Sequence, residues 1–106
     1  MIKQITTNEA KKLIEINEKV LLVFSSKWCG RCKINKFIWE KVFPQYEDQI
    51  KFANIDIDKQ DNWAAESNDF EINVFPTIIG YRNGKQIFVQ KNFTAEVKLK
   101  ELLDKL

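Results

Sequence analysis

A short, unbroken run of apolar residues from Val20 to Phe24 constrains most strongly how this chain can fold. Its length and its β-branched residues are typical of a strand that is buried on both faces of a sheet. Polar residues follow at 25–27, and the next segment carries apolar residues at helical spacing, namely Ile34, Phe37, Ile38 and Val42. The sequence therefore predicts a buried strand, a turn, and a helix from about Cys29 to Pro44, where the proline ends it.

The chain's only two cysteines, Cys29 and Cys32, fall in this turn and are separated by two residues. Because the chain has no histidine, a metal site on the pair would need carboxylates or a second chain for its other ligands. A histidine-dependent cysteine hydrolase is excluded because its base is absent. A purely structural disulfide would close too short a loop to stabilise the fold much. The cysteine pair therefore indicates redox chemistry more than a metal site or a structural disulfide.

The position of Cys29 favours its ionised form. This residue is expected at the start of the helix, where unpaired backbone N–H groups and the helix dipole stabilise negative charge. Arg31 adds a cation within the motif, and Lys27, Lys33 and Lys36 lie close in sequence. Since the thiolate is the form of cysteine that attacks disulfides, the sequence indicates an activated thiol at residue 29.

A second motif lies further along the chain. Residues 74–77 read Val-Phe-Pro-Thr and precede another apolar run, 78–81, which ends at the turn dipeptide Asn83-Gly84. Together with the Trp-Cys-Gly-Arg-Cys motif of residues 28–32 after a buried strand, this pattern resembles the thioredoxin family over nearly the whole chain. The resemblance implies a thioredoxin fold in which Pro76 is cis and the proline–threonine pair begins the next strand.

The resemblance also implies a role for each residue of the site. Cys29 is the expected nucleophile, Cys32 is the thiol that resolves the mixed disulfide, and the two form a redox-active disulfide. The residues expected to support the pair and border a substrate groove are Trp28, Gly30, Arg31, Phe75, Pro76, Thr77 and Asn92. The Phe75 backbone would pair with an extended substrate strand, which gives affinity without strict sequence choice. No metal and no cofactor are expected.

Three substitutions relative to the usual thioredoxin pattern affect the motif and the groove. Arg31 stands where the family commonly has proline, and we hypothesise that its charge makes the disulfide more oxidising than in a Gly-Pro relative. Phe37 replaces a proline that kinks the helix, and Asn92 replaces a glycine at the groove. We expect a straighter helix and an altered groove.

A further departure concerns proton transfer. Val23 and Asn54 stand where the family has a buried acid and its lysine partner. Neither side chain is able to move a proton, so the Cys32 proton must go to water or to another group. Asp56 and Asp58 are the candidate acceptors. A slower resolving step is expected.

The remaining pattern predicts the other elements. A short strand is expected at 2–5, a helix after a capping box of Thr6 and Glu9, a strand over 52–57 and a weak helix over 60–68. The Asn83-Gly84 turn joins two hairpin strands, and Thr94 caps a last helix that buries Val97 among several leucines. This order predicts an α/β protein, with a central mixed β-sheet of four to five strands, the 20–24 strand in its middle and helices on both faces. One domain spanning residues 1–106 is expected.

The charge balance limits the partners. The 17 basic and 15 acidic residues leave a formal charge of +2, too small a surplus to indicate nucleic acid or an anionic membrane. No apolar span is long enough to cross a bilayer, and the N-terminus lacks the pattern of a secretory signal. We therefore expect a cytoplasmic monomer without nucleic-acid or membrane partners.

The resemblance implies a thiol–disulfide oxidoreductase that reduces protein disulfides and is recharged by a thioredoxin-reductase-type enzyme. The first alternative is a more oxidising disulfide oxidase or isomerase, which Arg31 and the missing acid favour. A glutaredoxin is a weaker match, because Phe75 stands where that family usually has valine and no Gly-Gly pair follows. The last alternative is a thioredoxin-fold interaction module with little turnover, against which the intact cysteine pair argues.

Overall fold

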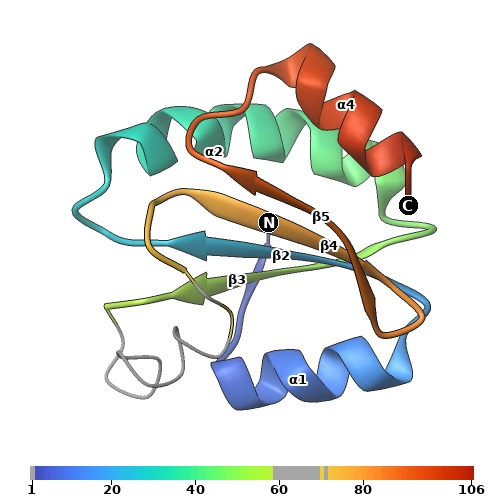
Figure 1. Ribbon diagram of the computed structural model, residues 1–106. Coiled ribbons are helices and arrows are strands. Elements are labelled where there is room, and N and C mark those ends of the chain that lie inside the picture. Colours follow the sequence, from blue (N-terminus) through green and yellow to red (C-terminus); the bar gives the residue numbers. More distant parts are fainter. Residues whose placement is uncertain (1, 59–69, 71) are drawn as a thin grey trace.

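The computed structural model describes residues 2–58, 70 and 72–106, and a five-stranded mixed sheet forms its centre (Figure 1). In spatial order the strands are β1 (Lys3–Gln4), β3 (Lys51–Asp56), β2 (Lys19–Ser25), β4 (Thr77–Arg82) and β5 (Lys85–Lys91). Strands β1, β3 and β2 run parallel, whereas β4 is antiparallel to β2 and β5 is antiparallel to β4. The predicted α/β fold with a mixed sheet and a central β2 is confirmed.

Helices cover both faces of this sheet (Figure 1). Helix α1 (Thr7–Ile16) lies on one face, and α2 (Gly30–Val42) and α4 (Glu96–Asp104) lie on the other. A short 3-10 helix, η1 (Phe43–Tyr46), follows α2 and contains the proline that was expected to end it. The helix predicted over 60–68 lies outside the described residues. Among the residues that the structure describes, no helix is long and apolar enough to span a membrane.

The central strand β2 is buried on both faces, as its sequence predicts. Leu21 and Val23 belong to the apolar core under α2 and α4, whereas Val20, Leu22 and Phe24 belong to the core on the α1 side. All five side chains are fully buried. Since burying one such side chain stabilises a fold by roughly 1.5–3 kcal/mol, β2 anchors both layers. This anchoring determines where the turn that carries the cysteines leaves the sheet.

Two local predictions are confirmed by the backbone geometry. Thr6 Oγ1 accepts a hydrogen bond from the Glu9 N–H at 3.1 Å, and the Glu9 carboxylate accepts one from the Thr6 N–H at 3.0 Å. These two bonds form the capping box at the start of α1. Asn83 and Gly84 have φ values of 52° and 81°, and a two-residue hairpin turn between β4 and β5 requires such positive angles at both positions.

The predicted buried face of α2 is partly wrong. Ile34 and Phe37 are 60% and 76% exposed, while Asn35, Trp39 and Val42 are buried. The three buried residues follow one another at steps of four and three residues, so they form one stripe along the helix. Asn35 is tolerated in this stripe because both polar ends of its amide are hydrogen-bonded.

The predicted start and buried side of α4 also need correction. The N-cap is Ala95, without a side-chain capping bond, so Thr94 does not cap the helix. The backbone of Thr94 instead pairs with the Asn35 side chain, and its hydroxyl donates to the Asn92 carbonyl at 3.4 Å. Val97 is 72% exposed. The predicted buried leucines are confirmed, namely Leu99, Leu102, Leu103 and Leu106.

Candidate active site

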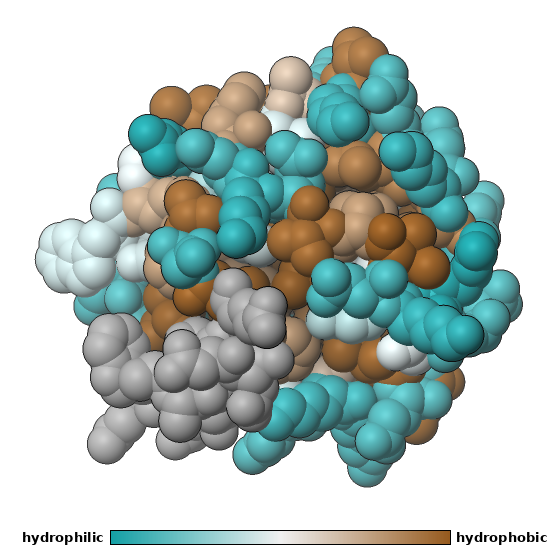
Figure 2. All heavy atoms as spheres, in the orientation of Figure 1, coloured by the Kyte–Doolittle hydropathy of each residue, from teal (hydrophilic) through white to brown (hydrophobic). Residues whose placement is uncertain are grey.

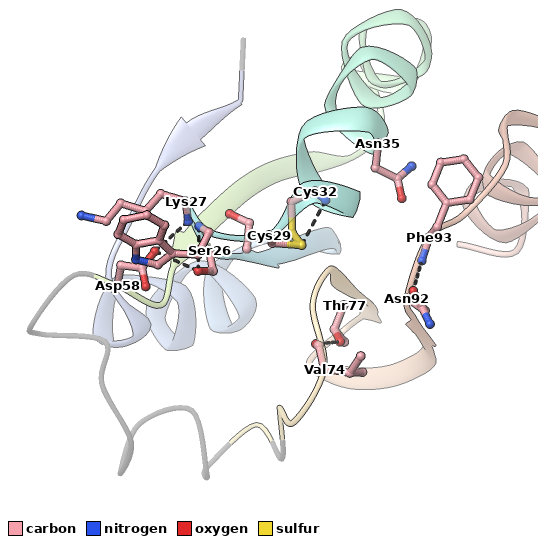
Figure 3. The surroundings of a disulfide bond; sticks show 12 residues. Ser26, Lys27, Cys29, Cys32, Asn35, Asp58, Val74, Thr77, Asn92 and Phe93 are labelled. Carbon is pink, nitrogen blue, oxygen red and sulfur yellow. Dashed lines mark hydrogen bonds between the residues drawn. A yellow bond between two sulfur atoms is a disulfide. The ribbon is translucent and has the colours of Figure 1, made fainter.

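The two cysteines lie where the chain passes from β2 into α2 (Figure 3). Cys29 is the N-cap of α2, and its Sγ accepts a hydrogen bond from the Cys32 N–H at 3.0 Å. The two residues form a disulfide, with Cα atoms 5.2 Å apart. The predicted placement of Cys29 at the helix start is confirmed. In the reduced protein, the N–H groups and dipole of α2 stabilise a thiolate at this position.

The two sulfurs differ in accessibility. Cys32 is 5% exposed, whereas Cys29 is half-buried. Trp28, directly before the pair, is 82% exposed, and the Lys27 ammonium lies 5.4 Å from the centroid of its ring. A large partner therefore reaches Cys29 more easily than Cys32, and it meets an aromatic surface beside the sulfur.

Asp58 holds the loop that leads to the cysteines (Figure 3). Its Oδ2 accepts hydrogen bonds from the Lys27 N–H at 2.6 Å and from the Ser26 hydroxyl at 2.9 Å. Ser26 Oγ in turn accepts a bond from the Trp28 N–H at 3.2 Å. In this view Asp58 and Cys32 lie at opposite ends of the loop. The Asp58 carboxylate therefore positions the turn through its bonds to Ser26 and Lys27. Ser26 has a positioning role that the sequence analysis missed.

A groove of about 550 Å³ lies beside Cys29. The predicted site residues that line it are Trp28, Gly30, Arg31 and Phe75, so four of the seven supporting residues meet at the exposed sulfur. On the face that Figure 2 shows, brown apolar side chains gather in patches between teal polar ones. Beside Cys29, the groove combines an aromatic side, Trp28, with a cationic one, Arg31.

The other three predicted residues lie outside the lining of this groove and organise the segment before β4. The Phe75–Pro76 peptide is cis, as the resemblance implies. Thr77 Oγ1 donates to the Val74 carbonyl at 2.6 Å, and the Asn92 N–H donates to the Pro76 carbonyl at 2.7 Å. The first bond closes the turn within the segment, and the second fastens the segment to the residue after β5.

Asn92 occupies a backbone conformation that explains why glycine is common there in the family. Its φ is 74°, in the left-handed region where a side chain normally clashes. Asparagine tolerates this region better than most residues because its short polar side chain forms local hydrogen bonds. Here Asn92 Oδ1 accepts such a bond from the Phe93 N–H at 2.9 Å. The substitution therefore preserves the local backbone.

Asn35 is a site-supporting residue that the sequence analysis missed. It lies fully buried one turn beyond Cys32, and its amide donates to the Thr94 carbonyl and accepts from the Thr94 N–H, both at 2.9 Å. This pair of bonds ties α2 to the loop before α4. Its spacing from Cys32 and Trp39, three and four residues, was the available signal that this polar side chain faces inward.

Val23 and Asn54, which stand where the family has a buried acid and its lysine partner, are neighbours in the sheet. Val23 is in register with Asn54, and Val23 is fully buried. The Asn54 amide accepts from the Ser25 hydroxyl at 2.9 Å and donates to Gln4 Oε1 at 2.7 Å. A neutral amide engaged in this way does not take up a proton at neutral pH.

The ionisable side chain of Tyr81 lies on the opposite face of the sheet from α2. Burial raises the pKa of Tyr81, in the core on the α1 side, to about 12, so this phenol stays neutral near pH 7. Within the described ranges, no three histidine, cysteine, aspartate or glutamate side chains come together as metal ligands would.

An α/β sheet that presents a Cys-x-x-Cys disulfide at the start of a helix is the architecture of a dithiol–disulfide exchange protein. A sequence model of the family described as Thioredoxin matches residues 1–106. The chain is 35% identical over 103 residues to a thioredoxin of Mycoplasmoides gallisepticum, covering 96% of this chain and 99% of the relative. The chain belongs to the thioredoxin family, and it is a thiol–disulfide oxidoreductase.

Solved structures agree with this assignment. A Plasmodium falciparum thioredoxin superposes with a TM-score of 0.85 at 27% identity, covering 98% of each chain. Oxidised mitochondrial thioredoxin 3 of Saccharomyces cerevisiae superposes with a TM-score of 0.86, covering 99% of this chain and 95% of its own. At 24% identity, the yeast structure supports the fold alone.

Proposed function

We propose that this protein reduces protein disulfides, with Cys29 as the nucleophile and Cys32 as the resolving thiol. The observation that carries the proposal is the difference between the sulfurs: Cys29 lies half-buried at a helix start beside a groove, and Cys32 is 5% exposed. An exchange protein needs one accessible, activated thiol and a second thiol held next to it.

In the first step, the Cys29 thiolate attacks one sulfur of a substrate disulfide. A bond forms between Cys29 and that sulfur, the substrate disulfide breaks, and its other sulfur leaves as a thiolate. The α2 N-terminus stabilises the attacking thiolate, and Arg31 adds a cation within the first turn. In the second step, Cys32 attacks Cys29, which forms the observed disulfide and releases the reduced substrate.

The groove supports extended protein segments as substrates. Trp28 offers an exposed apolar ring, and Gly30 leaves the approach to the sulfur without a side chain. Phe75 lines the same groove from the segment before β4, and its backbone pairs with a substrate strand. Pro76, Thr77 and Asn92 hold that backbone in place. Main-chain pairing of this kind accepts many sequences, so the proposed substrates are diverse proteins.

The proposed cycle needs a donor of electrons for the Cys29–Cys32 disulfide, and a thioredoxin-reductase-type enzyme fills this role. The curated bacterial thioredoxins among the relatives support this donor and a cytoplasmic location. We propose that the protein acts as a single-domain monomer and carries no cofactor of its own.

The test is insulin disulfide reduction with NADPH and a thioredoxin reductase, compared with glutathione as donor. We expect rapid turnover with the reductase and slow turnover with glutathione. Absence of turnover with both donors, in folded protein with titratable thiols, would contradict the proposal and favour an interaction module. Faster oxidation of a reduced substrate than reduction of insulin would favour the more oxidising alternative.

A further inference from the structure

A cavity of about 270 Å³ lies on the buried side of the cysteine pair. Cys32 lines it from α2, Ser25 from the end of β2, and Asn54 and Asp56 from β3. Trp39 of α2 also lines the cavity. Because Ser25, Asn54 and Asp56 give the cavity polar walls, this space is suited to water molecules that bridge Cys32 and Asp56.

The resolving step requires a proton acceptor at this place. A cysteine thiol with an ordinary pKa is mostly protonated at neutral pH, and only its thiolate attacks a disulfide. Val23 offers no acceptor, and both ends of the Asn54 amide are engaged with Ser25 and Gln4. The acceptor must therefore be a carboxylate or water that reaches Cys32 through the cavity.

The two carboxylates at the end of β3 have different surroundings. Asp58 Oδ2 is engaged by the Lys27 N–H and the Ser26 hydroxyl in the loop. Asp56 lies two residues after Asn54, so the alternation of a strand places it on the same face of the sheet. It is in register with Ser25, and it lines the cavity together with Cys32. Both carboxylates accept hydrogen bonds, but of the two only Asp56 lines the cavity with Cys32, so the structure favours Asp56.

We propose that Asp56 accepts the Cys32 proton across this cavity, through water, during the resolving step. The Cys32 sulfur forms a bond to Cys29, the bond between Cys29 and the substrate sulfur breaks, and the substrate leaves as a thiolate. The Cys32 proton passes to the Asp56 carboxylate and then to solvent. The inference rests on the proposed roles of Cys29 and Cys32.

The other charged groups that line the cavity are Lys27, Lys33, Lys36 and Glu40. Glu40 lies eight residues after Cys32 on α2, about 12 Å further along the helix axis, and it pairs with Lys36 at 3.9 Å. Glu40 thus lines the same cavity as Asp56 but lies far from the Cys32 sulfur. Its neutral variant, Glu40→Gln, is therefore a matched control for Asp56→Asn.

The test separates the two chemical steps with an aromatic disulfide reagent that releases a coloured thiolate in each. Attack by Cys29 releases the first equivalent, and attack by Cys32 on the resulting mixed disulfide releases the second. We expect Asp56→Asn to slow the second release about 10- to 100-fold and to leave the first unchanged. Glu40→Gln should leave both unchanged, and Asp56→Glu should retain most of the second rate.

A pH series identifies Asp56 as a base and not only a structural group. In Asp56→Asn, the second release should rise about tenfold per pH unit below the ordinary thiol pKa, because only preformed thiolate reacts. The wild-type rate should rise less steeply. The asparagine retains an oxygen to accept the Asp58 N–H, which now bonds Asp56 Oδ1 at 2.9 Å, so the loop is preserved.

Three outcomes would overturn the inference: an unchanged second release in Asp56→Asn, an equal loss in both releases, or an equal loss in Glu40→Gln. Failure of the underlying roles looks different. If Cys32→Ser accumulated no mixed disulfide on Cys29, the proposed assignment of nucleophile and resolving thiol would be wrong, whatever Asp56 does.

Discussion

The two sides of α2 differ in composition and in what they control. The exposed side carries Cys29 at the helix start and continues through Arg31, Ile34 and Phe37. The buried side carries residues that pack or pair inside the protein, namely Cys32, Asn35, Trp39 and Val42. Exposed side chains meet reaction partners, whereas buried ones set the geometry of the sulfurs. Apart from Cys32, which reacts from the buried side, substitutions there should change stability, whereas substitutions on the exposed side should change chemistry.

The largest effect should come from the exposed sulfur. Cys29→Ser removes the nucleophile and should lower insulin reduction by roughly 10³-fold or more, with little change in the urea midpoint relative to reduced wild type. Cys32→Ser should also stop turnover, but it should trap substrate on Cys29, which mass spectrometry of the intact adduct detects. A substrate adduct on Cys32 in the Cys29→Ser protein would reverse the proposed roles.

On the buried side, Asn35→Ala should destabilise the fold by about 2–4 kcal/mol, because it leaves the buried Thr94 N–H and carbonyl without partners. Urea unfolding of the reduced protein measures this loss. Ile34→Ala, next to Asn35 but 60% exposed, is the control and should change stability by no more than about 0.5 kcal/mol. Equal losses in both variants would remove the distinction between the two sides.

A smaller effect is expected from Arg31, which lines the groove in the first turn of α2. Arg31→Pro should make the disulfide more reducing by about tenfold in equilibrium with glutathione, or about 30 mV, because a cation near the thiolate is lost. Proline is tolerated structurally, since N–H groups of the first helical turn need no intrahelical partner. Arg31→Lys should stay close to wild type. A proline variant that is not more reducing would refute this charge effect.

The same contrast explains which parts of the molecule could be predicted from the sequence. The burial of β2 follows from its own five residues, and the hairpin turn follows from Asn83 and Gly84, whose backbone preferences are local. The start of α2 at Cys29 was predictable because the motif directly follows the strand. Each of these features depends on residues that are near one another in the chain.

The features that could not be predicted depend on contacts between distant segments. Asn35 is buried because Thr94, 59 residues away, satisfies its amide, and the same contact removes Thr94 from its predicted capping position. Phe37 looks like a core residue by composition, but it lies on the solvent side of α2. The cavity beside Cys32 likewise arises where α2 packs on β3, so the spacing of Asp56 and Asp58 alone left both as candidates.

The smallest effect on stability is expected from an exposed ion pair between α2 and α4. Like the buried Asn35–Thr94 bonds, this pair connects α2 to the C-terminal part of the chain. Glu96 on α4 bonds Lys41 of α2 at 3.0 Å and Lys100 at 3.3 Å, and these hydrogen bonds hold the pKa of its carboxyl below the ordinary value. A pKa that is lower in the folded state stabilises the fold above the unfolded pKa, and this contribution is lost as the pH falls through the folded value. Wild type should therefore be slightly more stable than Glu96→Gln near pH 7, and the difference should vanish in acid and shrink in high salt. Urea midpoints of both proteins across this pH range measure the difference. If the difference in stability persisted unchanged into acid, Glu96 would stabilise the fold through packing and not through its charge.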